Sequence, residues 1–291
     1  MPDVVKKPEL IHHVALRASR HSFDIRDAVE DLLRSRGMNA RQSSKEATRL
    51  QIPVELAIDQ HLSTFSGRQL VTYFQRDPRR PHRARPLVDA GKFRFTALIQ
   101  AELITMPPRK FEVLLGNLFV GLEFSDIAVT PMTSDGGVDF VGKVGLGRQP
   151  PTPGAITGPS PLHEQSVYFF GQAKRYTMTH PVETSEIDAL VGATRSLARG
   201  GGTAVKDRMI TALQGWGWQV NAPLIPMFAT TGWFRSSIPG YARTQGYSIF
   251  DGEQLAQRVA ASTVRIRTIR EARRAIRRLI DRPFDHVTWL G

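Results

Sequence analysis

Cysteine is absent from the chain, which excludes disulfide bonds and every metal site built from thiolate ligands. A metal ion would therefore need oxygen ligands or histidine. The chain also lacks a run of about 18 or more apolar residues, so no membrane span is predicted. Its first residues, MPDVVKKPEL, lack the apolar stretch of a secretory signal. Together these absences predict a soluble protein of the cytoplasm.

Acidic residues are scarce relative to basic ones. The 291 residues include 39 Lys and Arg against 27 Asp and Glu, a net charge of +12, and the isoelectric point is about 10.5. Such a balance favours a polyanionic partner, and nucleic acid is the commonest polyanion in the cytosol. A basic surface without a partner is the alternative. The 41% hydrophobic content is ordinary for a folded protein of one large or two small domains.

The first third of the chain predicts a mainly helical N-terminal domain over residues 1–96. Residues 1–21 show no clear period and predict a loose arm. Apolar spacing predicts a helix over 22–37, a second helix in SSKEATRLQ and a third element over 53–62, followed by a basic hairpin. Three helices and a hairpin follow one another in a winged helix, the fold that we expect for DNA recognition. A generic helical cap on the next domain is the alternative.

The stretch RDPRRPHRAR over residues 76–85 is dense in arginine and proline. Pro78 and Pro81 exclude a helix interior because proline lacks a donor and clashes with the preceding turn. The stretch is therefore either a solvated loop or a wing that contacts phosphates, for which the fork of arginine is well suited. The candidate DNA-binding residues are Arg76, Arg79, Arg80, Arg83, Arg85 and Arg175.

Residues 97–260 predict an α/β catalytic domain. Helical spacing over 97–123 is broken at Pro107–Pro108, and two strands surround the turn SDGGVDF. A Gly/Pro-rich insertion over 145–165 leads to the apolar strand SVYFFGQAKRY, and further helices and strands alternate after it. This order predicts a mixed central sheet flanked by helices.

The last segment, residues 261–291, is dominated by an arginine-rich amphipathic helix, IRTIREARRAIRRLIDR. Its isoleucines and leucine share one side, and its arginines occupy much of the rest. Two interpretations remain open: a docked helix with a solvated basic face, or a helix that follows phosphates.

Candidate catalytic residues come from three places. Asp139 follows a turn in which Gly136 and Gly137 permit positive φ. Gln172 and Lys174 stand at the polar end of the apolar strand, on one face because a strand has a period of two. The third place is an amphipathic helix just upstream, which carries Glu112.

These residue types suit the hydrolysis of a phosphodiester. Mg²⁺ prefers oxygen ligands, so Asp139 can anchor the ion and Gln172, Glu112 or the backbone carbonyl of Ala173 can add to its ligands. The ion polarises a phosphoryl oxygen and activates a water. Lys174 can position the attacking water and neutralise charge on the phosphate.

The motifs FEVLLGNLF, TPMTSDGGVDFVG, YFFGQAKRY and MFATTGWFRSSIPGYARTQGYSIFDGEQLAQ resemble the Mrr-like branch of the PD-(D/E)xK restriction endonuclease superfamily, over roughly residues 105–260. The resemblance implies a restriction-endonuclease-like core that uses Mg²⁺. It implies that Asp139 is the metal-binding acid, Lys174 the catalytic lysine and Glu112 the helix acid. Gln172 takes the place usually held by Asp or Glu.

Members of this branch cut double-stranded DNA, often as restriction enzymes, and several target modified DNA. The resemblance therefore predicts a type II or type IV-like endonuclease, often paired with a winged-helix recognition domain. Cutting both strands favours a homodimer or a higher homo-oligomer. The alternative is a nucleic-acid-binding module that has lost catalysis, which Gln172 supports because an amide adds no negative charge.

Overall fold

The computed structural model describes residues 5–120, 124–129, 138–145, 165–200, 204–263, 266–281 and 287–289. The predicted turn at Gly136 and Gly137 and nearly all of the predicted insertion at 145–165 lie outside the described residues.

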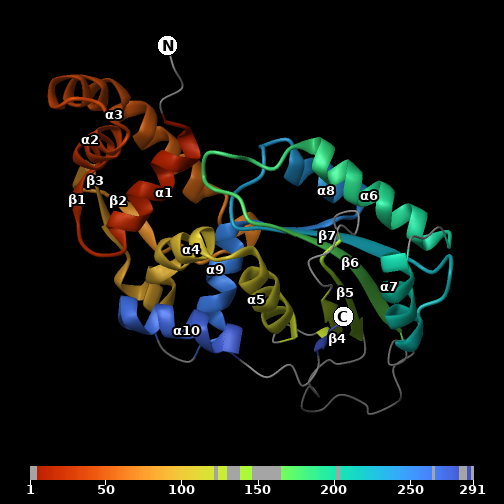
Figure 1. Ribbon diagram of the computed structural model, residues 1–291. Helices are drawn as coiled ribbons and strands as arrows, with labels where there is room; N and C mark the ends of the chain where they lie inside the picture. The colour runs from red at the N-terminus through yellow and green to blue at the C-terminus, as the bar shows by residue number, and fades with distance from the viewer. Residues whose placement is uncertain are drawn as a thin grey trace, which may run out of the picture.

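The N-terminal part combines three helices with a small antiparallel sheet (Figure 1). Its sheet has the order β1-β3-β2. The elements, in chain order, are α1 (Lys7–Ala18), β1 (Phe23–Asp24), α2 (Ile25–Ser35), α3 (Ala40–Ser63), η1 (Ser66–Arg68), β2 (Phe74–Asp77), β3 (Arg80–Pro86) and η2 (Val88–Phe95). Asp24 caps α2 by accepting a hydrogen bond from the Arg26 N–H, which fixes the start of that helix.

Two predictions for this part are wrong. Residues 7–18 form helix α1 instead of a loose arm, with Leu10, Val14 and Ala18 buried. The predicted second and third elements are a single helix, α3, with Pro53 inside it. Pro53 lies on the exposed side of α3, where a carbonyl that loses its N–H donor can be hydrated instead.

The larger part is built on a six-stranded mixed sheet of order β8-β7-β6-β5-β4-β9. Strand β5 is antiparallel to both of its neighbours, whereas β6, β7 and β8 run parallel, as do β4 and β9. This mixed sheet confirms the predicted α/β fold, although β9 was not predicted. The strands are β4 (Phe124–Val129), β5 (Phe140–Gly145), β6 (Ser166–Lys174), β7 (Leu224–Thr230), β8 (Ser248–Phe250) and β9 (Val287–Trp289).

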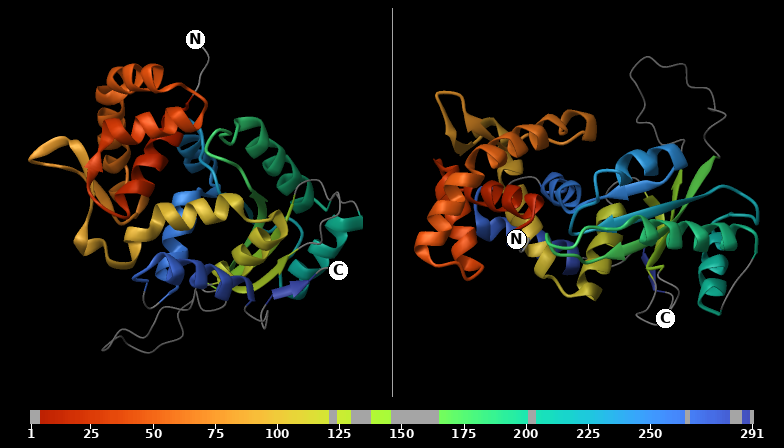
Figure 2. Two further views of the ribbon diagram at one scale, coloured as in Figure 1. Left: turned by 60° about the vertical axis from the view of Figure 1, so that its left-hand side comes forward. Right: turned by 90° about the horizontal axis from the view of Figure 1, so that it is seen from above.

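Helices cover both faces of this sheet (Figures 1 and 2). One layer holds α4 (Thr96–Thr105), α5 (Pro108–Val120), α9 (Gly252–Ala261) and α10 (Ile269–Asp281). The other holds α6 (Thr184–Ala198), α7 (Ala204–Gly215) and α8 (Ile238–Gln245), of which α7 was not predicted. The break predicted at Pro107–Pro108 separates α4 from α5, as expected for proline at a helix start.

Each face of the sheet has its own hydrophobic core. Phe140, Phe169 and Ala173 face the layer that contains α5. Tyr168, Phe170 and Phe228 face the layer that contains α6. Alternation along β6 therefore sets which layer each of its side chains meets. A third core lies among residues 10–97 of the N-terminal part.

A set of polar contacts ties the N-terminal part to the start of α9. Arg68 donates to Asp251 at 2.5 Å and to Glu253 at 3.2 Å. Glu253, which is only 6% exposed, also accepts from the Tyr73 hydroxyl at 3.0 Å and lies 3.2 Å from His61 Nε2. We call Arg68, His61, Tyr73, Asp251 and Glu253 the polar junction. It joins segments that are far apart in the sequence.

The described helices include none that is long and apolar enough to cross a membrane.

Candidate active site

Asp139 lies immediately before β5, where the ladder between β5 and β6 ends. Its backbone N–H donates to the carbonyl of Gly171 at 2.9 Å. Its carboxylate oxygen Oδ2 accepts a hydrogen bond from the backbone N–H of Ala173 at 2.6 Å. The carboxylate is thus held beside the backbone of β6, between Gln172 and Lys174.

Gln172 and Lys174 lie on the same face of β6 as Tyr168 and Phe170, because every second residue of a strand points to the same side. Gln172 is only 7% exposed, and its amide forms no hydrogen bond with the part of the chain that the structure describes. Lys174 is partly buried, and its ammonium group forms no ion pair among the described residues. Because neither group is paired among the described residues, both remain available to a ligand.

Gly171 leaves room for the ring of Phe140, which lies over β6 at this point. A Cβ atom on Gly171 would lie 2.0 Å from Cζ of Phe140, inside the ring's own volume. A side chain here would displace the Phe140 ring, which belongs to the buried core next to Asp139. Glycine at this position is therefore a requirement of the geometry.

Thr231 fixes the chain just beyond Lys174, a role that sequence reasoning missed. Its backbone N–H donates to the Lys174 carbonyl at 3.2 Å. Its hydroxyl donates to the Tyr176 carbonyl at 2.7 Å and accepts from the Tyr176 N–H at 3.0 Å. Burial, together with a hydrogen bond to the Glu186 carboxylate, raises the pKa of the Tyr176 phenol to about 12. The phenol therefore stays protonated and keeps donating to Glu186.

Glu112 comes from the other side of the sheet. It stands in the first turns of α5, whose layer covers the face opposite to that of Gln172 and Lys174. Its carboxylate accepts from Arg109 at 3.0 Å. The structure thus brings Asp139, Gln172, Ala173 and Lys174 together, and it places Glu112 in the neighbouring helix layer.

Three of the predicted DNA-binding arginines contact the protein itself. Arg76 donates to Asp59 at 2.8 Å and to Glu55 at 3.2 Å on α3, so its charge is already neutralised. Arg83 reaches the Ser22 carbonyl at 3.4 Å, and Arg175 reaches the Ile104 carbonyl at 3.4 Å. Three remain on the surface of the β2–β3 hairpin, which extends away from the rest of the molecule in the left view of Figure 2: Arg79, Arg80 and Arg85.

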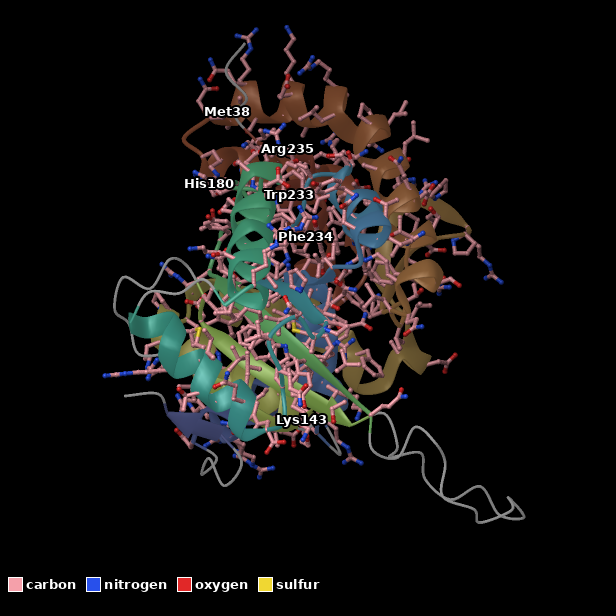
Figure 3. The ribbon with its side chains drawn as sticks, turned by 90° about the vertical axis from the view of Figure 1, so that its right-hand side faces the viewer. Met38, Lys143, His180, Trp233, Phe234 and Arg235 are labelled. Carbon is pink, nitrogen blue, oxygen red and sulfur yellow. The ribbon has the colours of Figure 1, made fainter. Side chains whose placement is uncertain are left out.

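His180, which follows β6 in the sequence, lies in an exposed turn. Its Nδ1 contacts the hydroxyls of Thr177 and Thr179 at 3.3 and 3.0 Å. Figure 3 shows it near Trp233 and Arg235, whereas Lys143 lies toward the other end of the sheet. Lys143 donates to the Trp216 carbonyl at 2.8 Å, a structural contact remote from Lys174.

The donors around Asp139 suit a hard divalent cation. The described residues contain no group of three or more His, Asp or Glu side chains that could hold a metal ion. However, a carboxylate oxygen of Asp139 lies beside β6 where the unpaired amide of Gln172 can offer a carbonyl oxygen. Mg²⁺ usually keeps several waters and needs only one or two carboxylates. The residues present therefore fit Mg²⁺.

Residues 103–212 match the family model Mrr_cat, a restriction endonuclease domain. The match includes Glu112, Asp139, Gln172 and Lys174 and confirms the predicted resemblance to Mrr-like restriction endonucleases for this segment. The comparison with curated proteins found no match.

Two solved structures are similar to part of the chain. One is the MspJI restriction endonuclease in complex with a 27-mer oligonucleotide, with 18% identity and a TM-score of 0.44 over 68% of this chain. The other is the DNA modification-dependent restriction endonuclease AspBHI, with 16% identity and a TM-score of 0.38 over 67% of this chain. The matched parts span 38% and 40% of those chains.

Proposed function

We propose that this protein is a Mg²⁺-dependent DNA endonuclease of the PD-(D/E)xK type. The observation that carries the proposal is the Asp139 carboxylate held against Ala173 N–H, beside the unpaired polar groups of Gln172 and Lys174. The restriction endonuclease match over 103–212 supports it. We further propose a restriction or defence enzyme of the type II or type IV-like class that acts in the cytoplasm, on modified DNA, as a homodimer or higher homo-oligomer.

Each residue has a defined part in this proposal. Asp139 and Gln172 would hold Mg²⁺ through oxygen atoms, with the Ala173 carbonyl and Glu112 as further candidates. A bound Mg²⁺ supplies a Lewis acid for the phosphate and favours deprotonation of water. The Lys174 ammonium would orient the attacking water and neutralise the charge that develops on the phosphate. Hydrolysis adds this water across one P–O bond. The oxygen of the water stays on phosphorus, and the cut strand is left with one phosphate end and one hydroxyl end.

The N-terminal part would provide DNA recognition. The element order is that of a winged helix: α1, the short strand β1, α2, α3 and then the β2–β3 hairpin. Strand β1 pairs with β3 and so extends the hairpin to three strands. The exposed Arg79, Arg80 and Arg85 of the hairpin would contact phosphates, and Arg175 would do so beside the catalytic strand. The ion pairs of Arg76 with Asp59 and Glu55 argue against a DNA contact for Arg76.

Cleavage of plasmid DNA with Mg²⁺, methylated and unmethylated, tests the proposal. Asp139→Ala and Lys174→Ala should each lower the cleavage rate by about 100-fold or more, because a preorganised charge at the phosphate is lost. Lys143→Ala is the matched control, since Lys143 lies on the neighbouring strand and its ammonium group donates to the Trp216 carbonyl. Circular dichroism should show all three variants folded. Cleavage by folded Asp139→Ala at the wild-type rate would remove the active-site assignment.

The second candidate is a DNA-binding module without catalysis. The specific observation that favours it is Gln172, an uncharged residue where a second carboxylate would strengthen cation binding. It predicts salt-dependent DNA binding with no cleavage under any divalent ion. The cleavage assay therefore separates the two candidates directly.

A further inference from the structure

Helix α10 carries a row of arginines that the proposed active site does not use. One side of α10 is buried against its own layer through Ala272, Ala275, Ile276 and Leu279. The helix end is held there by Asn117, whose amide donates to the Leu279 carbonyl at 2.5 Å. On the opposite side, all exposed, lie Arg270, Arg273, Arg274, Arg277 and Arg278. We call these residues the arginine row.

Most of the arginine row forms no ion pair among the residues that the structure describes. Arg273 donates to Glu102 of α4 at 2.7 Å. The other four form no ion pair within the described part of the chain. Some arginines elsewhere are paired, as Arg17 is with Asp31 and Arg235 with Glu183. On α10, by contrast, four guanidinium groups without a counter-charge among the described residues gather on one face of a single helix.

The docked helix holds these like charges close together. Arg270 and Arg274, like Arg274 and Arg278, are four residues apart and neighbours on the helix surface, where like charges repel. Nothing in the packing of α10 requires arginine at these outward positions. A polyanion bound along the helix would relieve the repulsion, and the planar guanidinium forks match phosphate oxygens.

The arginine row is linked to the end of β6 through helix α4. Glu102, which Arg273 contacts, and Ile104, whose carbonyl accepts from Arg175, both belong to the last turns of α4. Arg175 directly follows Lys174. One helix, about 10–12 Å across with its side chains, therefore separates the arginine row from the end of the catalytic strand. Figure 1 shows α10 on the outside of its layer, beside α4 and α9.

We infer that the arginine row binds the phosphate backbone of duplex DNA beside the cleavage site. The 13 residues of α10 extend over about 20 Å, a length along which a duplex carries about 12 phosphate charges. This surface would position the duplex and add affinity without reading sequence. The choice of duplex DNA as the ligand rests on the proposed function, whereas the unpaired charge on α10 is observed independently of that function.

The test is binding of the full chain to a fluorescent duplex of about 30 bp without divalent metal, over a range of salt concentrations. Arg270, Arg274 and Arg277 are replaced together by Gln. We expect affinity to fall by at least about tenfold, and the slope of log K against log salt to shrink by about 2 to 3, because three phosphate contacts are lost. The melting temperature of the free variant should stay the same or rise, because repulsion is relieved.

The matched control replaces Arg195, Arg199 and Arg243 by Gln. These arginines are exposed on the α6 and α8 side of the sheet and remove the same charge. An equal effect of both triple variants would overturn the inference, since net charge alone would then explain binding. The inference would also be overturned if the α10 triple variant lost binding to a single-stranded RNA of the same length as strongly as it loses binding to the duplex.

The two proposals fail separately. Binding that depends on the arginine row, without cleavage under any divalent ion, would remove the nuclease function and keep the DNA surface. Cleavage abolished by Asp139→Ala, with binding unchanged in the α10 variant, would keep the nuclease and remove the surface.

Discussion

In the proposed site, Gln172 is the residue whose chemistry would most strongly affect metal binding. An amide offers a carbonyl oxygen but no negative charge. A Mg²⁺ ion held by Gln172 and Asp139 would therefore have the Asp139 carboxylate as its one charged ligand from these two residues. The same neutrality lets Gln172 remain buried beside Asp139 without repulsion. In the proposed site, Gln172 would therefore favour stability of the metal-free protein over cation affinity.

The substitution Gln172→Glu should reverse that balance. Without metal, two neighbouring carboxylates repel, and we expect the melting temperature to fall by about 2–4 °C, equivalent to about 1 kcal/mol for a protein of this size. Saturating Mg²⁺ should restore it and raise it more than in the wild type, because the ion binds only the folded protein. Thermal unfolding with EDTA or Mg²⁺ measures both effects.

Asp139→Asn in the Gln172→Glu background is the control. It should remove the response to Mg²⁺ if Asp139 and position 172 share the ion. A response that survives in this double variant would contradict the shared site.

Single residues of the site differed in how far the sequence could predict them. Gln172 and Lys174 share a face because of strand alternation alone, so their relation was predictable. The contact of Asp139 with Ala173 N–H depends on where the β5–β6 ladder ends, which spacing does not specify. The support from Thr231 was not predictable, since Thr231 and Lys174 are brought together only by pairing between β6 and β7.

Whole elements were misjudged where polar residues interrupt the apolar pattern. Helix α1 contains His12 and His13, which weaken its period, yet Pro8 in its first turn suits a helix start. Helix α3 continues through Pro53 because the missing donor faces solvent. Helix α7, by contrast, was missed between glycine-rich segments, and β9 is too short to show a period.

At the scale of elements, we expect the polar junction to contribute much of the stability of the contact between η1 and α9. Arg68→Gln removes the guanidinium that bridges Asp251 and Glu253, and leaves buried carboxylates short of a counter-charge. We expect the free energy of unfolding to fall by about 3 kcal/mol, measured by urea denaturation. Arg49→Gln, which removes an exposed pair with Glu46, should have a much smaller effect. Equal losses in both variants would contradict a structural role for the junction.

At the scale of the whole molecule, His12 makes stability depend on pH. Burial lowers the pKa of His12 to about 4, despite the opposing influence of Glu253. Between about pH 6.5 and 4 the unfolded chain therefore binds a proton that the folded protein excludes. Stability should be complete above this window and fall by up to about 1.4 kcal/mol per pH unit as the pH is lowered through it.

Urea denaturation at several pH values tests this expectation. His12→Gln should flatten the loss of unfolding free energy at acidic pH relative to the wild type. The exposed His21 provides the control, because its replacement by Gln should leave the wild-type slope intact. Identical pH dependence in the wild type and His12→Gln would contradict the assignment.

The α/β class was predictable because alternating strands and helices leave periodic signals along the sequence. The attachment of the N-terminal part to α9 was not, since it relies on polar contacts between residues 180 or more positions apart, such as Tyr73 and Glu253. No local pattern encodes such a pair. The same long-range packing desolvates His12 near Glu253.

The separation of Arg68 and Asp251 by 183 residues also has a consequence for the newly made chain. At a synthesis rate of about 5–20 residues per second, Arg68 leaves the ribosome roughly 10 to 40 s before its partner does. During that interval the nascent N-terminal helices must rely on their own apolar centre. The guanidinium of Arg68 and the phenol of Tyr73 then stay hydrated until Asp251 and Glu253 have emerged.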